Sequence, residues 1–163
     1  FKFILFESKK KFIWKLHHYC LMPNHVHLLV QMEKGLHLPK LMHFILLSYS
    51  RWYRKETPYI GYLWQGRYKS LLIDKESYML ECGRYIERNP VRAKLAQTPQ
   101  DYSWSSYCHY ALGQKDPLVD EDPHYREFGI DLIERRKRYV EFVSLEGPYD
   151  KIVDEALING SAV

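Results

Sequence analysis

The apolar side chains change their spacing in the first third of the chain, and this change limits the folds open to it. Residues 13–16 and 19–30 are rich in aromatic and branched side chains, which is typical of extended structure. Apolar residues then recur at steps of three and four from Leu38 to Tyr53, the pattern of an amphipathic helix of about four turns that ends before Pro58. A chain that combines both periods belongs to the α+β class, and we expect its strands to be antiparallel.

Proline and capping residues mark other expected elements. Pro23 lacks a backbone donor and is expected at a bulge, an edge or a strand start. Asp74 is a good N-cap for a second helix, and Pro90 predicts its end, because the residue before a proline is pushed out of the α region. The remaining expected elements are a helix end within residues 1–11 with a basic last turn, a strand at 67–73, a loop at 97–106 and a helix at about 131–143.

Charge divides the chain of 163 residues near residue 112. Residues 1–112 hold 17 Lys and Arg against 8 Asp and Glu, whereas residues 113–163 hold 7 against 12. We therefore expect a basic domain at 1–112 and an acidic, mainly helical extension at 113–163, with a linker at 111–123 that contains Gly, Pro and several acids. The basic part favours a polyanionic partner.

Composition excludes several other classes. No apolar run approaches the roughly 20 residues of a membrane span, so we expect no membrane partner. Cys20, Cys82 and Cys108 stand far apart and are odd in number, which predicts a reduced, cytoplasmic chain rather than a disulfide framework. Nothing near Phe1 has the pattern of a targeting signal, and since the chain does not begin with Met, we expect it to start inside a longer protein.

The segment Asn24-His-Val-His-Leu-Leu-Val30 carries the clearest chemical pattern. On a strand, His25 and His27 point to the same face, with aliphatic side chains on the other. Two adjacent imidazoles form two thirds of a divalent-metal site, but the same pattern fits hydrogen-bonded histidines on a half-buried sheet. The other histidines lack a matching partner and are expected to be packing or surface residues: His17, His18, His37, His43, His109 and His124.

A second candidate segment is the helix around Tyr85. Tyr85 and Asn89 are four residues apart and therefore lie on one helix face. A tyrosine hydroxyl beside a metal can act as a nucleophile, and the amide oxygen of Asn89 is a plausible third ligand. The alternatives are core packing for Tyr85 and helix termination for Asn89.

Three blocks together resemble a known family: NHVHLLV, then WQGRYKS, then YIERNPVRAKL. In this order and spacing they resemble the single-tyrosine HUH transposases, and among them most closely the REP-associated tyrosine transposases. The likeness runs from about residue 1 to 110, which makes residues 1–112 the expected catalytic domain. WSSY at 104–107 and the later RRKRYVEFV are also similar to this family.

The resemblance implies a ferredoxin-like α+β fold with a central antiparallel sheet packed by helices. The family's first strand would precede Phe1 and is expected to be missing. Two histidines and a polar residue on the tyrosine helix hold one divalent metal in this family, Mg or Mn, and they correspond to His25, His27 and Asn89. The helix tyrosine, here Tyr85, cuts single-stranded DNA at hairpin-forming palindromes and keeps the 5′ phosphate as a phosphotyrosine, in proteins that are monomers or homodimers.

Residues that contact DNA are expected where cations flank aromatic side chains, because aromatic rings stack on unpaired bases while the cations hold phosphates. These candidates are Trp64, Gln65, Arg67, Tyr68, Lys69, Arg84, Arg88 and Arg92. A core position for Trp64 is an equally good interpretation.

Two other functions fit parts of the pattern. The first is a hairpin-DNA-binding or regulatory protein, derived from a transposase, that has lost catalysis. The second is a small metal-dependent hydrolase that uses bound water and does not need Tyr85.

Overall fold

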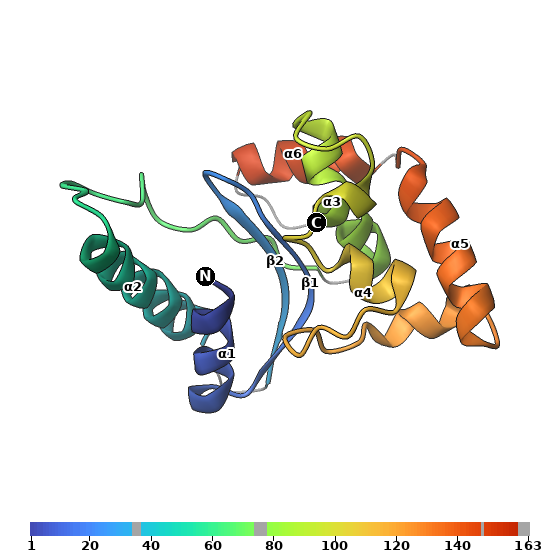
Figure 1. Cartoon of the computed structure of the whole chain (residues 1–163), viewed down its shortest axis with the longest axis horizontal. Coiled ribbons are helices and arrows are strands. Elements are labelled where there is room, and N and C mark those ends of the chain that lie inside the picture. Colours follow the sequence, from blue (N-terminus) through green and yellow to red (C-terminus); the bar gives the residue numbers. More distant parts are fainter. Residues whose placement is uncertain (34–36, 74–77, 148, 160–163) are drawn as a thin grey trace. The chain divides into compact units, whose positions relative to one another are not determined.

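The computed structural model describes residues 1–33, 37–73, 78–147 and 149–159 (Figure 1). Within these residues the chain forms six α-helices, two 3₁₀ helices and one two-stranded antiparallel sheet, which confirms the α+β class. In chain order the elements are α1 Lys2–Lys11, β1 Trp14–Leu21, β2 Val26–Met32, α2 Leu38–Glu56, α3 Tyr78–Arg92, η1 Pro99–Asp101, α4 Tyr107–Leu112, η2 Pro123–Phe128, α5 Leu132–Ser144 and α6 Tyr149–Asn159. No helix in the described residues is long and apolar enough to cross a membrane.

The chain separates into two compact units, which are described one at a time. Unit 1 comprises residues 1–15 and 31–69, and unit 2 comprises residues 16–30 and 70–163. In unit 1, α1 packs on α2, with Phe12 and Phe44 in ring contact at 5.7 Å between centroids. The basic last turn of α1 is confirmed, and so is the amphipathic helix α2, which ends at Glu56, before Pro58 as expected.

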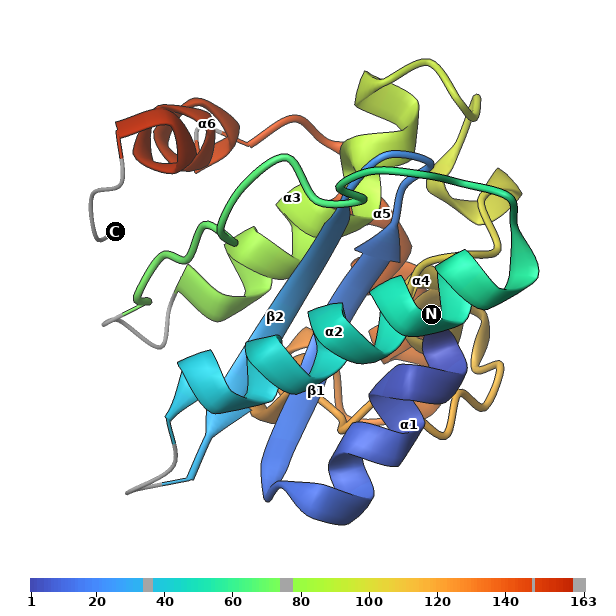
Figure 2. The ribbon, with the colours of Figure 1, turned by 90° about the vertical axis from the view of Figure 1, so that its left-hand side faces the viewer.

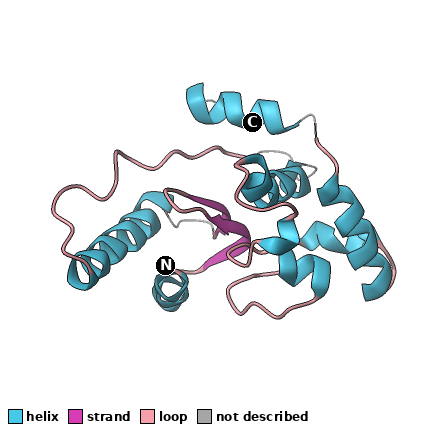
Figure 3. Cartoon of the chain, turned by 45° about the horizontal axis from the view of Figure 1, so that its top comes forward, coloured by secondary structure: helices cyan, strands magenta, loops and turns pink. Residues whose placement is uncertain are grey.

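Unit 2 begins with the inner part of the β-hairpin, drawn in magenta in Figure 3. The turn closes through the Met22 N–H, which donates to the His25 carbonyl at 2.9 Å. Pro23 lies in this turn, where its missing donor costs nothing, so residues 19–30 are two strands rather than one interrupted strand. The expected strand at residues 67–73 is wrong: these residues are irregular, because no described strand pairs with their backbone.

Helix α3 packs on the hairpin through an apolar cluster (Figure 2). The cluster joins Cys20, Met22 and Leu29 of the hairpin to Cys82, Tyr85 and Ile86 of α3 and to Tyr149 and Val153 of α6. The expected helix end at Pro90 is wrong, since α3 continues to Arg92. Proline in the last turn removes one backbone hydrogen bond only, and the Leu95 N–H closes the helix end on the Pro90 carbonyl at 2.8 Å. The expected N-cap Asp74 lies outside the described residues.

The C-terminal part of unit 2 is bound to the hairpin and to α3. Residues 111–123, expected as a linker, pair with β1: the Asp120 N–H donates to the Leu16 carbonyl and the Leu16 N–H to the Asp120 carboxylate, both at 2.8 Å. The expected helix near 131–143 is confirmed as α5, with Asp131 as its N-cap. Helix α6 is an element that the sequence analysis did not predict.

A buried polar network connects β1, α3 and the C-terminal part of unit 2. The His18 imidazole is fully buried, with Nδ1 at 2.9 Å from a Glu87 oxygen and Nε2 at 3.2 Å from an Asp122 oxygen. Glu87 also accepts hydrogen bonds from the hydroxyls of Ser106, at 2.6 Å, and Tyr139, at 2.7 Å. His18 was expected to be a packing or surface residue. In the structure it is instead a buried residue that pairs with two carboxylates.

The two carboxylates keep His18 charged. Burial alone lowers the pKa of His18, but the hydrogen bonds to Asp122 and Glu87 outweigh burial and raise its pKa to about 9. Burial raises the pKa of Asp122, and the contact with His18 more than reverses this and lowers it. The network is therefore an ion pair at neutral pH.

We expect the free energy of unfolding to fall as the pH rises from about 6.5 to about 9. Because the folded-state pKa of His18 lies above its unfolded value, its contribution is complete below pH 6.5 and is lost through pH 9, on the order of 3 kcal/mol in all. Urea unfolding at a series of pH values measures the change, and NMR of the His18 ring measures its pKa directly. His124→Gln, at a partly exposed histidine, should keep the pH dependence, whereas a His18 ring that titrates near pH 6.5 would contradict the assignment.

Candidate functional site

The two candidate ligand histidines lie at the start of β2. His25 is the last residue of the hairpin turn, and His27 is the second residue of the strand. Their Nε2 atoms are 3.0 Å apart and their rings are nearly perpendicular, at 4.8 Å between centroids. The two imidazoles that sequence analysis places on one face are thus in direct contact.

Both imidazoles are in the protonation state that binds metal. Burial lowers the pKa of His25, and burial, His25 and Arg92 lower that of His27 to about 4, so both rings are neutral at pH 7. His25 Nδ1 lies 2.7 Å from the Asn24 side-chain oxygen and is therefore assigned as its donor, which leaves a lone pair on Nε2. Two ligand nitrogens at about 2.1 Å from one metal are about 3 Å apart when they are adjacent, close to the observed separation.

The histidine pair therefore fits as part of a metal site that other ligands would complete. In the described part of the chain, no group of three His, Cys, Asp or Glu side chains is arranged to hold a metal. Asn89, the expected third ligand, donates from its amide nitrogen to the Tyr85 carbonyl at 2.8 Å. Its amide oxygen is then the atom available for a ligand role.

Tyr85 packs against the histidine pair from α3. Its ring meets the His27 ring edge to face at 5.7 Å between centroids, and only 4% of the residue is exposed. The chain thus brings together His25, His27 and Tyr85 from segments about 60 residues apart. The core packing considered for Tyr85 is also present, because it belongs to the apolar cluster of α3, the hairpin and α6.

The Tyr85 hydroxyl is held by a residue that the sequence analysis did not select. It donates a hydrogen bond to Asp154 of α6 at 2.8 Å, and the other oxygen of Asp154 pairs with Arg92. Arg92 also lies over the Tyr85 ring, at 5.0 Å from its centroid. Burial and Asp154 raise the pKa of Tyr85 to about 12, against the opposing effect of Arg92. The phenol is therefore neutral in this arrangement.

One sequence signal points to α6 and so to Asp154. Tyr149, Val153 and Ala156 are buried and follow one another at steps of four and three, which is the spacing of a helix face. Asp154 itself has no local signal, because its partners lie 62 and 69 residues away along the chain.

The candidate DNA-contacting residues are divided between the two units. In unit 1, the Trp64 indole N–H donates to the Leu46 carbonyl at 3.1 Å and to the Ser50 hydroxyl at 2.8 Å, so Trp64 packs on α2. The other unit 1 candidates lie in irregular structure, where Gln65, Arg67 and Lys69 are exposed and Tyr68 is half-buried.

The three arginine candidates in unit 2 have partners within the chain. Arg84 pairs with Glu81 and lies over the Phe142 ring, and Arg88 donates to backbone carbonyls of α5. Both are buried, whereas Arg92 is exposed at the edge of the site. DNA contacts at Arg84 and Arg88 stay predictions. The described conformation does not favour them, because both side chains are buried and already have partners within the chain.

Comparison with known proteins identifies one family. The family model described as "Transposase IS200 like" matches residues 1–89, more than half of the chain. The matched span includes both histidines, Tyr85 and Asn89. No curated protein and no solved structure matches the chain significantly.

We expect Asp154→Asn to lower the pKa of Tyr85 from about 12 towards its ordinary value near 10, because the carboxylate that disfavours the phenolate is removed. NMR of ring-labelled tyrosine, with Tyr85→Phe to assign the signal, measures ionisation between pH 9 and 11. Glu155→Gln, at the neighbouring exposed acid, is the matched control and should leave the pKa unchanged. Equal titration of Tyr85 in the wild type and in Asp154→Asn would contradict the contact.

Proposed function

Because the chain belongs to the IS200-like transposase family, we propose that it is a metal-dependent single-stranded DNA endonuclease and strand transferase. Its substrates in this proposal are palindromes that fold as hairpins. The observation that carries the proposal is the contact of His27 with both His25 and Tyr85, which joins two neutral imidazoles to a tyrosine ring. A hydrolase that uses bound water would need Tyr85 only for core packing and not for chemistry.

In the proposed reaction Tyr85 is the nucleophile. Its phenolic oxygen attacks the scissile phosphorus, the bond from phosphorus to the 3′ oxygen breaks, and the 5′ phosphate stays on the tyrosine. The phenol loses its proton and the departing 3′ oxygen gains one, so the step is balanced. Because the phosphotyrosine conserves the energy of the broken bond, a free 3′ hydroxyl can reverse the step and join strands without ATP.

In this proposal His25, His27 and the amide oxygen of Asn89 would hold the divalent metal, Mg or Mn. When bound, it supplies positive charge that polarises the phosphate and stabilises the transition state. The chain's own residues orient the nucleophile: the His27 ring meets the Tyr85 ring edge to face, the Arg92 guanidinium lies over the Tyr85 ring, and α3 carries both Tyr85 and Asn89. For attack, the Tyr85 hydroxyl must exchange its hydrogen bond to Asp154 for a phosphate.

We also propose the finer features that the resemblance implies. These are the REP-associated subtype, a ferredoxin-like catalytic domain at residues 1–112 with an extension at 113–163, and a monomeric or homodimeric state. A cytoplasmic location agrees with the three free cysteines. In DNA binding we propose phosphate contacts for the exposed Arg67, Lys69 and Arg92, with Gln65 and Tyr68 beside them.

A second candidate function is a hairpin-DNA-binding protein without catalysis. The burial of Tyr85 and the engagement of its hydroxyl by Asp154 favour this alternative, because the nucleophile is not accessible in the described conformation. The two functions differ in whether a covalent adduct forms.

We expect a covalent DNA–protein adduct that depends on Tyr85. Labelled hairpins from the flanks of the gene are incubated with the protein and Mg²⁺ or Mn²⁺, then run on a denaturing gel. Tyr85→Phe should abolish the adduct and leave hairpin binding within about twofold, because only the reacting oxygen is lost. Tyr62→Phe, at a tyrosine that is 90% exposed, is the control and should keep the adduct. Binding without an adduct under every metal would favour the second candidate.

We expect His25→Ala to weaken Mn²⁺ binding at least tenfold and to reduce cleavage in parallel, because one of two imidazole ligands is removed. Isothermal titration with Mn²⁺ measures the affinity without DNA. His37→Ala, at an exposed histidine in unit 1, is the matched control. An unchanged Mn²⁺ titration in His25→Ala would remove the ligand assignment.

A further inference from the structure

The last turn of α3 places a cation beside the proposed nucleophile. Tyr85, Asn89 and Arg92 follow one another at steps of four and three, so all three lie on one face of the helix. The Arg92 guanidinium lies over the Tyr85 ring, at 5.0 Å from its centroid. It is also close enough to the histidine pair to lower the pKa of His27, after burial and His25. Arg92 therefore brings positive charge to both halves of the candidate site.

The carboxylate of Asp154 shows where an anion fits in this site. One of its oxygens accepts the hydrogen bond of the Tyr85 hydroxyl at 2.8 Å, and the other pairs with Arg92. A phosphate that the tyrosine attacks needs the same position, because its phosphorus must come within about 3–3.5 Å of the phenolic oxygen. Carboxylate and phosphate also offer a guanidinium the same partner, two oxygens at one edge. Asp154 thus marks the place of a phosphate that approaches Tyr85.

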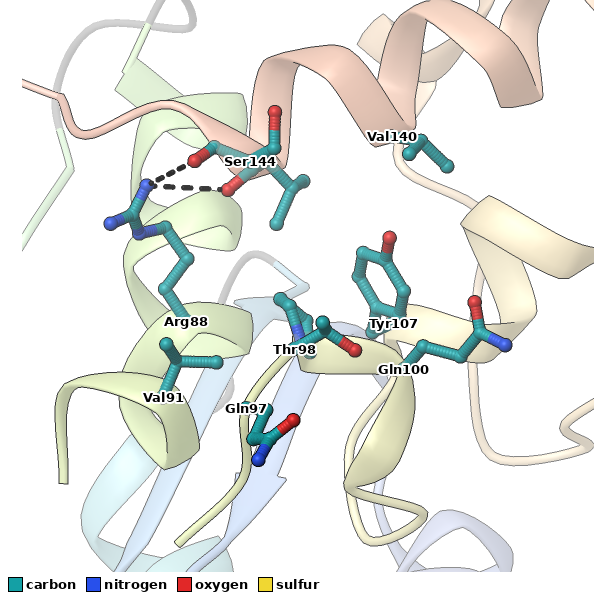
Figure 4. A pocket seen from close by; sticks show the side chains of 10 residues that line it. Arg88, Val91, Gln97, Thr98, Gln100, Tyr107, Val140 and Ser144 are labelled. Carbon is teal, nitrogen blue, oxygen red and sulfur yellow. Dashed lines mark hydrogen bonds between the residues drawn. The ribbon is translucent and has the colours of Figure 1, made fainter. Parts of the chain in front are cut away.

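Helix α3 carries two other arginines, and both are held by partners within the chain. Arg88 donates to the Ser144 carbonyl at 3.1 Å, one of the two bonds drawn as dashed lines in Figure 4, and this fixes its guanidinium on the end of α5. Arg84 pairs with Glu81. Both arginines are buried, whereas 31% of the Arg92 side chain is exposed. Arg92 is therefore the arginine of α3 that a DNA phosphate can reach from solvent.

We propose that Arg92 is a catalytic residue that contacts the scissile phosphate in the position that Asp154 occupies in the structure. The inference rests on the proposed function, since it assigns a further group to that reaction. When DNA displaces the carboxylate, the Tyr85 hydroxyl and the Arg92 guanidinium both meet the same phosphate. The guanidinium then donates to the non-bridging oxygens, on which charge builds up as the phenolic oxygen bonds to phosphorus and the 3′ oxygen leaves. Arg92 keeps its protons throughout, so it supplies charge and no acid.

Single-turnover kinetics of adduct formation test this role. Protein in excess over a labelled hairpin, with Mn²⁺, gives the rate of adduct formation and the hairpin affinity as separate quantities. We expect Arg92→Gln to slow adduct formation about hundredfold and to weaken hairpin binding less than about fivefold, because the lost charge acts mainly in the transition state. Arg92→Lys should recover about tenfold of the rate, since it restores the charge without the two-point contact.

Neutral phosphates in the DNA identify which phosphate Arg92 contacts. A methylphosphonate replaces one non-bridging oxygen by a methyl group and so removes the negative charge that the guanidinium would meet. With this group at the scissile position, Arg92→Gln should slow adduct formation less than about threefold relative to the wild type on the same DNA. With the group one phosphate away, the loss of about hundredfold should remain. Equal losses at the two positions would overturn the proposal.

Two variants separate this role from packing. Asp154→Asn removes the same ion pair between α3 and α6 but leaves the guanidinium, so a rate at or above that of the wild type supports the catalytic role. Arg138→Gln, at an exposed arginine that pairs with Glu134, is the matched control and should keep the wild-type rate. If the wild type forms the adduct but Arg92→Gln matches its rate, or is slowed only as much as Asp154→Asn, the proposal is overturned and the proposed function stands. If the wild type forms no adduct, both fail.

Discussion

The structure of unit 2 depends on one buried ion pair, His18 between Glu87 and Asp122. A charged histidine that is removed from water is costly unless both nitrogens have acidic partners, and here each has one. The partners come from α3 and from the segment before η2, so the pairing fixes both against β1. The hydroxyls of Ser106 and Tyr139 complete the hydrogen bonds of Glu87 and bring α5 into the same network.

This pairing requires α3 to approach β1 closely, and Gly83 permits that approach. A Cβ atom at Gly83 would lie 2.7 Å from His18 Nε2, which no real side chain tolerates. Two residues further along the helix, Tyr85 reaches the histidine pair on the neighbouring strand. The distance from Tyr85 to His27 therefore follows from packing around His18, and a larger residue at position 83 would move the proposed nucleophile away from the proposed ligands.

Local patterns predicted those parts of the site that depend on neighbours in sequence. The alternation around His25 and His27 and the four-residue step from Tyr85 to Asn89 are short-range signals, and each is a matter of strand or helix geometry. The roles of His18 and Asp154 could not be predicted in the same way, because their partners lie more than 60 residues away. For the same reason a strand was wrongly expected at 67–73: composition favours extension there, but a strand exists only where another offers its backbone.

Burial acts in opposite ways on the two halves of the candidate site. It lowers the pKa of His25 and His27, so both imidazoles keep the lone pairs that a cation needs. It raises the pKa of Tyr85, which holds the phenol neutral and unreactive. Arg92 is the group that opposes this rise, and it is already paired with Asp154. The cation that lies over the Tyr85 ring is thus already neutralised by Asp154, and in the proposed function a divalent cation held by His25 and His27 would supply the positive charge that lowers the pKa of the phenol.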